Sequence, residues 1–199
     1  MNPEQIALLL IDIQRDFWQP LRKHPEFESF PRNVGILLSK ARAMNFTVVH
    51  IRSEFKRDRS DWMPFYKPYG RGDVPCIEGT EGALIEDFAA PLPHEIVIKK
   101  QTFDGFVKTD LEVLLKDHGV KGLLLSGLET SICVLFTATS AYLRGFVPLV
   151  VTDACADEPE RHEATLRMYR DLCFKTVTTK QVRDEWPSIA SLVGLFTEK

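Results

Sequence analysis

The chain has 199 residues and a formal net charge of −3, and 27% of its residues are charged and 44% hydrophobic. This length fits a single domain over residues 1–199 and is short for two domains of ordinary size. Charges of both signs are mixed along the chain, which argues against a nucleic-acid-binding surface. Apolar runs stay well below the roughly 18 residues needed to cross a bilayer. With no basic flank before the first short apolar run, we expect no signal peptide and a cytoplasmic protein.

Apolar runs typical of buried parallel strands alternate with helical patterns along the whole chain. The predicted strands are, in chain order, 6–11, 46–51, 95–98, 122–125, 147–151 and 174–178. The predicted helices are 32–44, 83–88, 110–118, a helix from Thr130 or Ser131 to Gly145, and 159–172, followed by a weakly helical tail around 189–195. This alternation predicts an α/β fold, a three-layer α/β/α sandwich around a six-stranded parallel sheet.

Two stretches read as loops. The first follows Asp12 and contains Pro20, Pro25 and Pro31. The second is the longest irregular stretch, 52–82, and a loop of this length in a compact domain is usually a lid, a binding wall or flexible. Its aromatic residues are equally compatible with a pocket wall and with a subunit interface: Trp62, Phe65, Tyr66 and Tyr69.

Three side chains with catalytic potential follow strand ends: Asp12 after the first strand, Lys100 after the third and Cys133 after the fourth. In open parallel sheets, ligands bind outside the carboxyl ends of the strands. Cys133 lies in the first turn of a predicted helix, where we expect its thiol to ionise readily. Cys133 would attack a carbonyl carbon, Asp12 would accept the thiol proton, and Lys100 would hold Asp12 and favour the thiolate. The other cysteines, Cys76, Cys155 and Cys173, read as reduced structural residues.

Motifs around these three residues resemble the isochorismatase-like cysteine hydrolase superfamily over nearly the whole chain. They are residues 9–17 (LLIDIQRDF), 97–106 (VIKKQTFDGF) and 127–134 (GLETSICV), with support from 152–156 (TDACA). The resemblance implies a catalytic triad of Asp12, Lys100 and Cys133, with Lys99 as the alternative lysine. It also implies a cis peptide bond between Leu128 and Glu129, and an oxyanion hole formed by the backbone N–H groups of Glu129 and Cys133.

The resemblance also bears on the sheet and the pocket. It implies the strand order 3-2-1-4-5-6, although the order 2-1-3-4-5-6 would bring the three catalytic side chains together more easily. The segment Asp104-Gly105-Phe106 departs from the Ser-Ala-Phe that is usual in the family. Residues expected to line a substrate pocket are Gln14, Phe17, Trp18, Phe103, Phe106 and Thr130.

Two comparisons within the superfamily narrow the predicted reaction. Nicotinamidases carry an Asp-x-His…His metal site after the second strand, whereas residues 50–55 here read HIRSEF. We therefore expect no metal and no cofactor. A retained cysteine favours C–N bond hydrolysis of a small amide, ureide or carbamoyl compound through a covalent intermediate. The alternatives are vinyl-ether hydrolysis of isochorismate, in which Cys133 would be dispensable, and a non-catalytic binding module. Relatives commonly form dimers or tetramers, so we expect a homo-oligomer.

Overall fold

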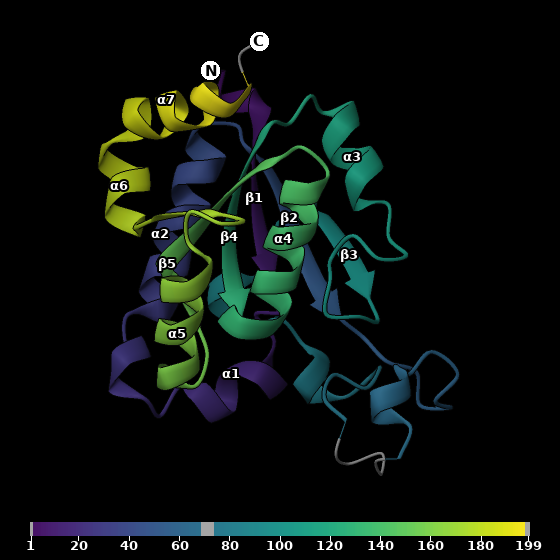
Figure 1. The fold of residues 1–199 in the computed structure, drawn as a ribbon. Coiled ribbons are helices and arrows are strands. Elements are labelled where there is room, and N and C mark those ends of the chain that lie inside the picture. The colour runs from purple at the N-terminus through teal and green to yellow at the C-terminus, as the bar shows by residue number, and fades with distance from the viewer. Residues whose placement is uncertain (1, 69–73, 198–199) are drawn as a thin grey trace.

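A computed structural model describes residues 2–68 and 74–197 and contains a six-stranded parallel sheet with the order β3-β2-β1-β4-β5-β6 (Figure 1). This order confirms the one implied by the family resemblance, and the alternative 2-1-3-4-5-6 is wrong. The strands are β1 (Ile6–Ile11), β2 (Thr47–Ser53), β3 (Ile96–Lys100), β4 (Gly122–Leu128), β5 (Val147–Ala156) and β6 (Lys175–Val177).

Helices cover both faces of the sheet. One face carries α2 (Phe30–Ala43), α6 (Thr179–Asp184) and α7 (Trp186–Thr197), and the other carries α3 (Leu111–Asp117), α4 (Leu135–Leu143) and α5 (Pro159–Tyr169). A further helix, α1 (Arg15–Leu21), lies at the end of the sheet to which the strand arrows point (Figure 1). Among the residues that the structure describes, no helix combines the length and the apolar composition that a membrane crossing would require.

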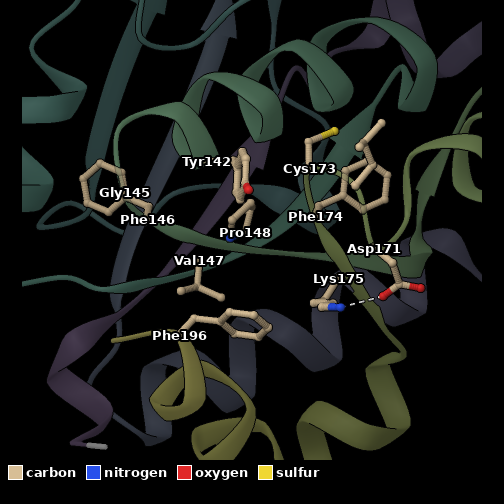
Figure 2. Close-up of a pocket in the computed structure, with 11 residues that line it drawn as sticks. Tyr142, Gly145, Phe146, Val147, Pro148, Asp171, Cys173, Phe174, Lys175 and Phe196 are labelled. Atoms are coloured by element: carbon tan, nitrogen blue, oxygen red, sulfur yellow. Dashed lines mark hydrogen bonds and ion pairs between the residues drawn. The ribbon is translucent and has the colours of Figure 1, made fainter. Parts of the chain in front are cut away.

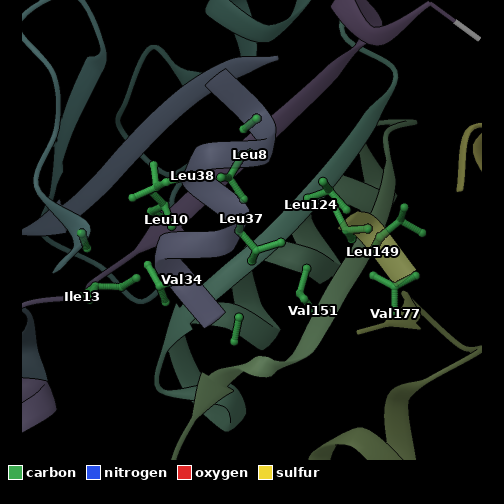
Figure 3. Packing of buried hydrophobic residues seen from close by; sticks show 14 of the residues in the cluster. Leu8, Leu10, Ile13, Val34, Leu37, Leu38, Leu124, Leu149, Val151 and Val177 are labelled. Carbon is green, nitrogen blue, oxygen red and sulfur yellow. The ribbon is translucent and has the colours of Figure 1, made fainter. Parts of the chain in front are cut away.

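The apolar residues of β1 explain why this strand lies in the middle of the sheet. All six of its residues are buried, and alternate side chains point to opposite faces. Leu8 and Leu10 pack with Val34 and Leu37 of α2, as Figure 3 shows, while Leu9 packs into the cluster on the α3–α4 side. A strand that is buried on both faces needs the continuous apolar run seen in the sequence.

Several elements differ from their predicted bounds because tertiary contacts outweigh local preference. The helix α1 forms in a predicted loop, despite Pro20, because its Trp18 packs against Phe30 with 4.8 Å between ring centroids. The predicted helix 83–88 is interrupted because Ile85 pairs with Gln14 in an isolated β-bridge. Only short 3₁₀ turns, Glu81–Ala83 and Asp87–Ala89, form there.

The carboxyl ends of β4 and β5 run further than predicted. The predicted break at Ser126 is a register shift within β4, after which Gly127 pairs with Cys155. The Ser126 hydroxyl is buried and donates to the carbonyl of Ala154 at 2.6 Å. A Cβ on Gly127, whose φ is +142°, would lie 2.0 Å from the backbone oxygen of Ile11. Glycine therefore allows β4 to stay beside β1 up to the point where the Cys133 segment begins.

An ion-paired cluster anchors the edge strand β3. The buried Glu95 carboxylate lies one residue before β3. It accepts hydrogen bonds from Arg42 of α2 and from the backbone N–H of Leu92, and it lies 3.0 Å from the His50 ring of β2. Burial opposes ionisation of Glu95, but these bonds outweigh it and lower the pKa of its carboxyl to about 2. The cluster thereby fixes the strand whose last residue is Lys100.

The lowered pKa of Glu95 predicts a pH-dependent stability. Since the pKa in the folded state lies below the ordinary value of 4.5, the stabilisation is complete above about pH 4.5 and is lost as the pH falls toward about 2. We expect Glu95→Gln to lower the free energy of unfolding at pH 7 by about 2 kcal/mol, because it weakens charge-assisted hydrogen bonds. Urea unfolding at several pH values should show the wild-type and variant curves converging in acid. A constant difference down to pH 2 would contradict this account.

Candidate active site

Asp12 occupies the turn directly after β1. Its backbone adopts a φ of +50°, a region that aspartate tolerates better than most residues, and its N–H donates to the carbonyl of Ile51 at 2.8 Å. This turn directs the carboxylate toward the ends of the neighbouring strands. Oδ1 accepts the backbone N–H of Ser53, the last residue of β2, at 2.7 Å. Asp12 has no exposed surface.

Lys100 reaches Asp12 from two strands away. It ends β3 in register with Ser53 of β2, and β2 lies between β3 and β1. The Lys100 Nζ lies 2.6 Å from Asp12 Oδ2 and donates to the Ser53 hydroxyl at 2.9 Å and to the carbonyl of Thr102 at 2.8 Å. The long lysine side chain crosses the end of β2 where a small serine stands, so the order 3-2-1-4-5-6 still brings the charges together.

Cys133 completes the group from the segment after β4. Its Sγ lies 3.4 Å from Lys100 Nζ, and its side chain is buried. The segment Thr130–Val134 forms a π-helical turn ahead of α4 rather than the first turn of a regular α-helix. The turn is capped by Asp157, whose Oδ2 accepts the N–H of Ser131 at 2.8 Å, and not by Thr130 or Ser131 as predicted. The peptide bond between Leu128 and Glu129 is cis, as the family resemblance implied.

The electrostatics of the group differ from expectation. Burial, and then the Asp12 carboxylate, raise the pKa of the Cys133 thiol well above its usual range, and Lys100 offsets only part of this. The prediction of a readily ionised thiol is therefore wrong. Burial also opposes the charge on Lys100, but Asp12 and Cys133 outweigh it and raise the pKa of the lysine. Lys100 Nζ thus contacts both the Asp12 carboxylate and the Cys133 sulfur, and the raised pKa means that this thiol holds its proton more firmly than a free one.

A cavity of about 260 Å³ opens beside the Cys133 thiol. Two of the predicted pocket residues, Phe17 and Phe103, line it. The remaining walls come from α1, from the ends of β2 and β3, from the 52–82 segment and from the turn after β4, and they are Asp16, Ser53, Phe55, Met63, Tyr66, Pro75, Thr102, Glu129 and Ile132. A largely apolar cavity with a few polar groups and a nucleophile is the usual form of a small-molecule site.

Four residues predicted for the pocket lie elsewhere. Gln14 is buried, and its amide holds Ser53 through both the backbone N–H and carbonyl while also donating to Ala83. Trp18 packs in the α2-side core, and the Thr130 hydroxyl contacts His162 of α5 at 2.9 Å. Phe106 stacks on Phe146 in the opposite core. These residues were assigned to the pocket because they lie in or beside the motifs, but a position in a motif does not show in which direction a side chain points.

The aromatic residues of the 52–82 segment, which the sequence assigns equally to a pocket wall or to a subunit interface, take different positions in the structure. Tyr66 lines the cavity, and burial together with the nearby Cys133 raises the pKa of its hydroxyl to about 12. Trp62 is instead buried in a small cluster with Phe55, and Phe65 is largely exposed. Tyr69 lies outside the described residues.

Ser53 and the side chains of Asp16 and Glu129 were not predicted for this site. The register of β2 and β3 places Ser53 beside Lys100, which a prediction of the strand order could have indicated. Lys99, the alternative lysine, points away from the site and pairs with Glu54 at the surface. In the described part of the chain, no three His, Cys, Asp or Glu side chains are grouped closely enough to hold a metal ion.

A second cavity of about 260 Å³ lies at the amino end of β5, away from the Asp12, Lys100 and Cys133 group (Figure 2). Its labelled walls include Tyr142, Val147 at the start of β5, and Phe196 of α7, with an ion pair between Asp171 and Lys175 at 2.7 Å. It adjoins the amino end of β5, whereas parallel sheets bind ligands at the carboxyl ends. The Asp12, Lys100 and Cys133 group lies at the other end, so we take the first cavity as the candidate site.

Comparisons with known proteins identify the family of the chain. The isochorismatase domain family matches residues 6–182. Streptothricin hydrolase of Streptomyces noursei is 35% identical over 150 residues, or 75% of this chain and 54% of that protein, so the chain spans about half the length of this relative. Nicotinamidase 3 of Arabidopsis thaliana is 30% identical over 168 residues, or 83% of this chain and 80% of that protein.

A solved structure shares the fold. The crystal structure of an isochorismatase family protein from Desulfovibrio vulgaris aligns with a TM-score of 0.81 and 30% identity, covering 92% of this chain and 98% of that one. This chain therefore belongs to the isochorismatase-like hydrolase family.

Proposed function

We propose that the protein is a cysteine amidohydrolase that cleaves a C–N bond in a small amide, ureide or carbamoyl compound. The observation that carries the proposal is the contact of Lys100 Nζ with both Asp12 and Cys133 beside a cavity of about 260 Å³. A buried nucleophile, a carboxylate and an ammonium group in contact are the parts that acyl transfer requires.

In the first half-reaction, the Cys133 Sγ attacks the carbonyl carbon while Asp12 accepts the thiol proton. The raised pKa of the thiol favours this coupled transfer over attack by a preformed thiolate. The backbone N–H groups of Glu129 and Cys133 are proposed to bind the oxyanion. Asp12 then returns the proton to the leaving nitrogen, the C–N bond breaks, and a thioester remains on Cys133.

In the second half-reaction, water attacks the thioester carbonyl and Asp12 accepts a proton from that water. The C–S bond breaks, the acid leaves, and the proton returns to the Cys133 sulfur. Lys100 keeps its charge throughout, since Asp12 and Cys133 hold its pKa above the ordinary value. Its role is to position Asp12 and to balance the negative charge that develops on the sulfur.

Two further observations support hydrolysis of an amide-like bond. The relative Nicotinamidase 3 is named for an amidase activity, and the match covers 83% of this chain. The cavity walls from Phe17, Phe55 and Phe103 suit a small, partly apolar acyl group.

The proposal predicts ammonia release from a subset of small amides. The wild-type protein should be assayed against primary amides, ureides and N-carbamoyl amines, with ammonia as the readout. For an accepted substrate, intact-mass spectrometry after rapid acid quenching should show an adduct of acyl or carbamoyl mass on the peptide that contains Cys133. Turnover of isochorismate together with inactivity on every amide would reject the proposal.

A further inference from the structure

The Glu129 carboxyl is an unused acceptor at the candidate site. Glu129 lines the cavity four residues before Cys133, on the same turn. Within the described residues, its carboxyl has neither a hydrogen-bond partner nor an ion pair. Burial, and then the charge of Asp157, raise the pKa of this carboxyl, and Arg161 acts in the other direction. A half-buried carboxyl of this kind gains from any donor brought into the cavity.

The second acidic side chain of the cavity is already engaged. Asp16 accepts the backbone N–H of Cys76 at 2.7 Å. Its carboxylate fills the space beside Gly82, where an added Cβ would lie 2.0 Å from Asp16 Oδ1. Asp16 is thus held in place by the backbone and adds negative charge to the cavity, while Glu129 offers the free acceptor atoms.

Positive charge is scarce at the same walls. No Lys, Arg or His side chain is among the cavity-lining residues that the structure describes. The nearby ammonium of Lys100 is buried, is bound to Asp12, Ser53 and Thr102, and contacts the Cys133 sulfur at 3.4 Å. Among the described lining residues, an anionic ligand would therefore face two carboxyl groups and no cation, since Lys100 is already paired with Asp12. Aromatic walls such as Phe17 and Tyr66 can accommodate a cation against a ring face.

We propose that Glu129 is a specificity-determining residue that binds a positively charged amine on the substrate, so that the cavity selects small cationic compounds over anionic ones. Applied to turnover, this inference rests on the proposed function and names its substrate class as amides or ureides that carry a protonated amine. The ammonium would donate to the Glu129 carboxylate while the scissile carbonyl lies against the Cys133 thiol.

Binding of three matched probes tests the selectivity without turnover. Benzylamine, benzyl alcohol and benzoate share a ring and differ in charge, and none has an amide bond to hydrolyse. Titration calorimetry or ligand-observed NMR with the wild-type protein should give a dissociation constant for benzylamine about tenfold lower than for benzoate, since one charge-assisted hydrogen bond contributes about that factor. Equal binding, tighter benzoate binding or no detectable benzylamine binding would overturn the inference.

Variants locate the effect. Glu129→Gln keeps the shape of the side chain and removes its charge, and should reduce the preference for benzylamine to about twofold or less. Glu158→Gln is the matched control, because this nearby carboxylate does not line the cavity and instead contacts His24 at 3.4 Å. The control should keep the full preference. A preference that persists in Glu129→Gln would show that another group binds the amine and would overturn the assignment.

The two proposals fail separately. If benzylamine selectivity depends on Glu129 but no amide is hydrolysed, the selectivity of the cavity stands and the amidohydrolase proposal is lost. If amides are hydrolysed with a Cys133 adduct but charge has no effect on binding, the reaction stands and the role of Glu129 is lost.

Discussion

Replacing Cys133 with alanine is expected to lower kcat/KM for any accepted amide by about 10⁴-fold or more, because the variant cannot form the covalent intermediate. The protein should remain folded. The sulfur belongs to the core cluster on the α3–α4 side but borders a cavity, so its removal deletes few contacts, and the ion pair of Lys100 with Asp12 is kept. Ammonia release and thermal unfolding, measured on the same preparation, would show loss of activity with little change in the midpoint.

Two comparisons make this result specific. Cys173→Ala removes another buried thiol that lies outside the candidate site, and it should retain wild-type activity. Cys133→Gly distinguishes the proposed reaction from vinyl-ether hydrolysis, in which Asp12 alone would protonate the substrate. Activity of Cys133→Gly on isochorismate, or unchanged amide hydrolysis by Cys133→Ala, would remove the covalent mechanism.

The fold could be predicted closely because its main signals are local. The uninterrupted apolar run of β1 identifies a central strand, and strand–helix alternation leaves few topologies. The bounds were least accurate where contacts distant in sequence decide the structure. At Ser126 a side-chain hydrogen bond to β5 extends β4 beyond its predicted end, and α1 depends on the packing of Trp18 against Phe30.

The candidate site could be predicted only in part. The motifs predict that Asp12, Lys100 and Cys133 form one site. They leave two strand orders open, because a sequence does not show that the Lys100 side chain extends past Ser53 to reach Asp12. The state of the thiol was misjudged because a position near a helix start carries no information on burial. Pocket walls from the 52–82 segment depend on a chain path without regular periodicity, and Tyr66 is one of these walls.

Replacing Asp12 with asparagine is expected to reduce both stability and activity. Asp12 and Lys100 are fully buried, and removal of one charge leaves the other without compensation in a poorly solvating interior. We expect the free energy of unfolding to fall by about 3–5 kcal/mol. Activity should fall by about 10²–10⁴-fold, because the thiol, whose pKa is raised, loses its proton acceptor. Urea unfolding and ammonia release measure the two effects.

The double variant Asp12→Asn with Lys100→Met separates these two roles of the ion pair. Removing both charges leaves no uncompensated ion, so most of the lost stability should return while activity stays absent. Asp184→Asn is the matched control: Asp184 pairs with Arg183 at the solvent-exposed surface, and the urea midpoint should hardly change. Two results would contradict this account of the buried ion pair between Asp12 after β1 and Lys100 of β3. One is an Asp12→Asn variant as stable as the wild type, and the other is a double variant no more stable than Asp12→Asn.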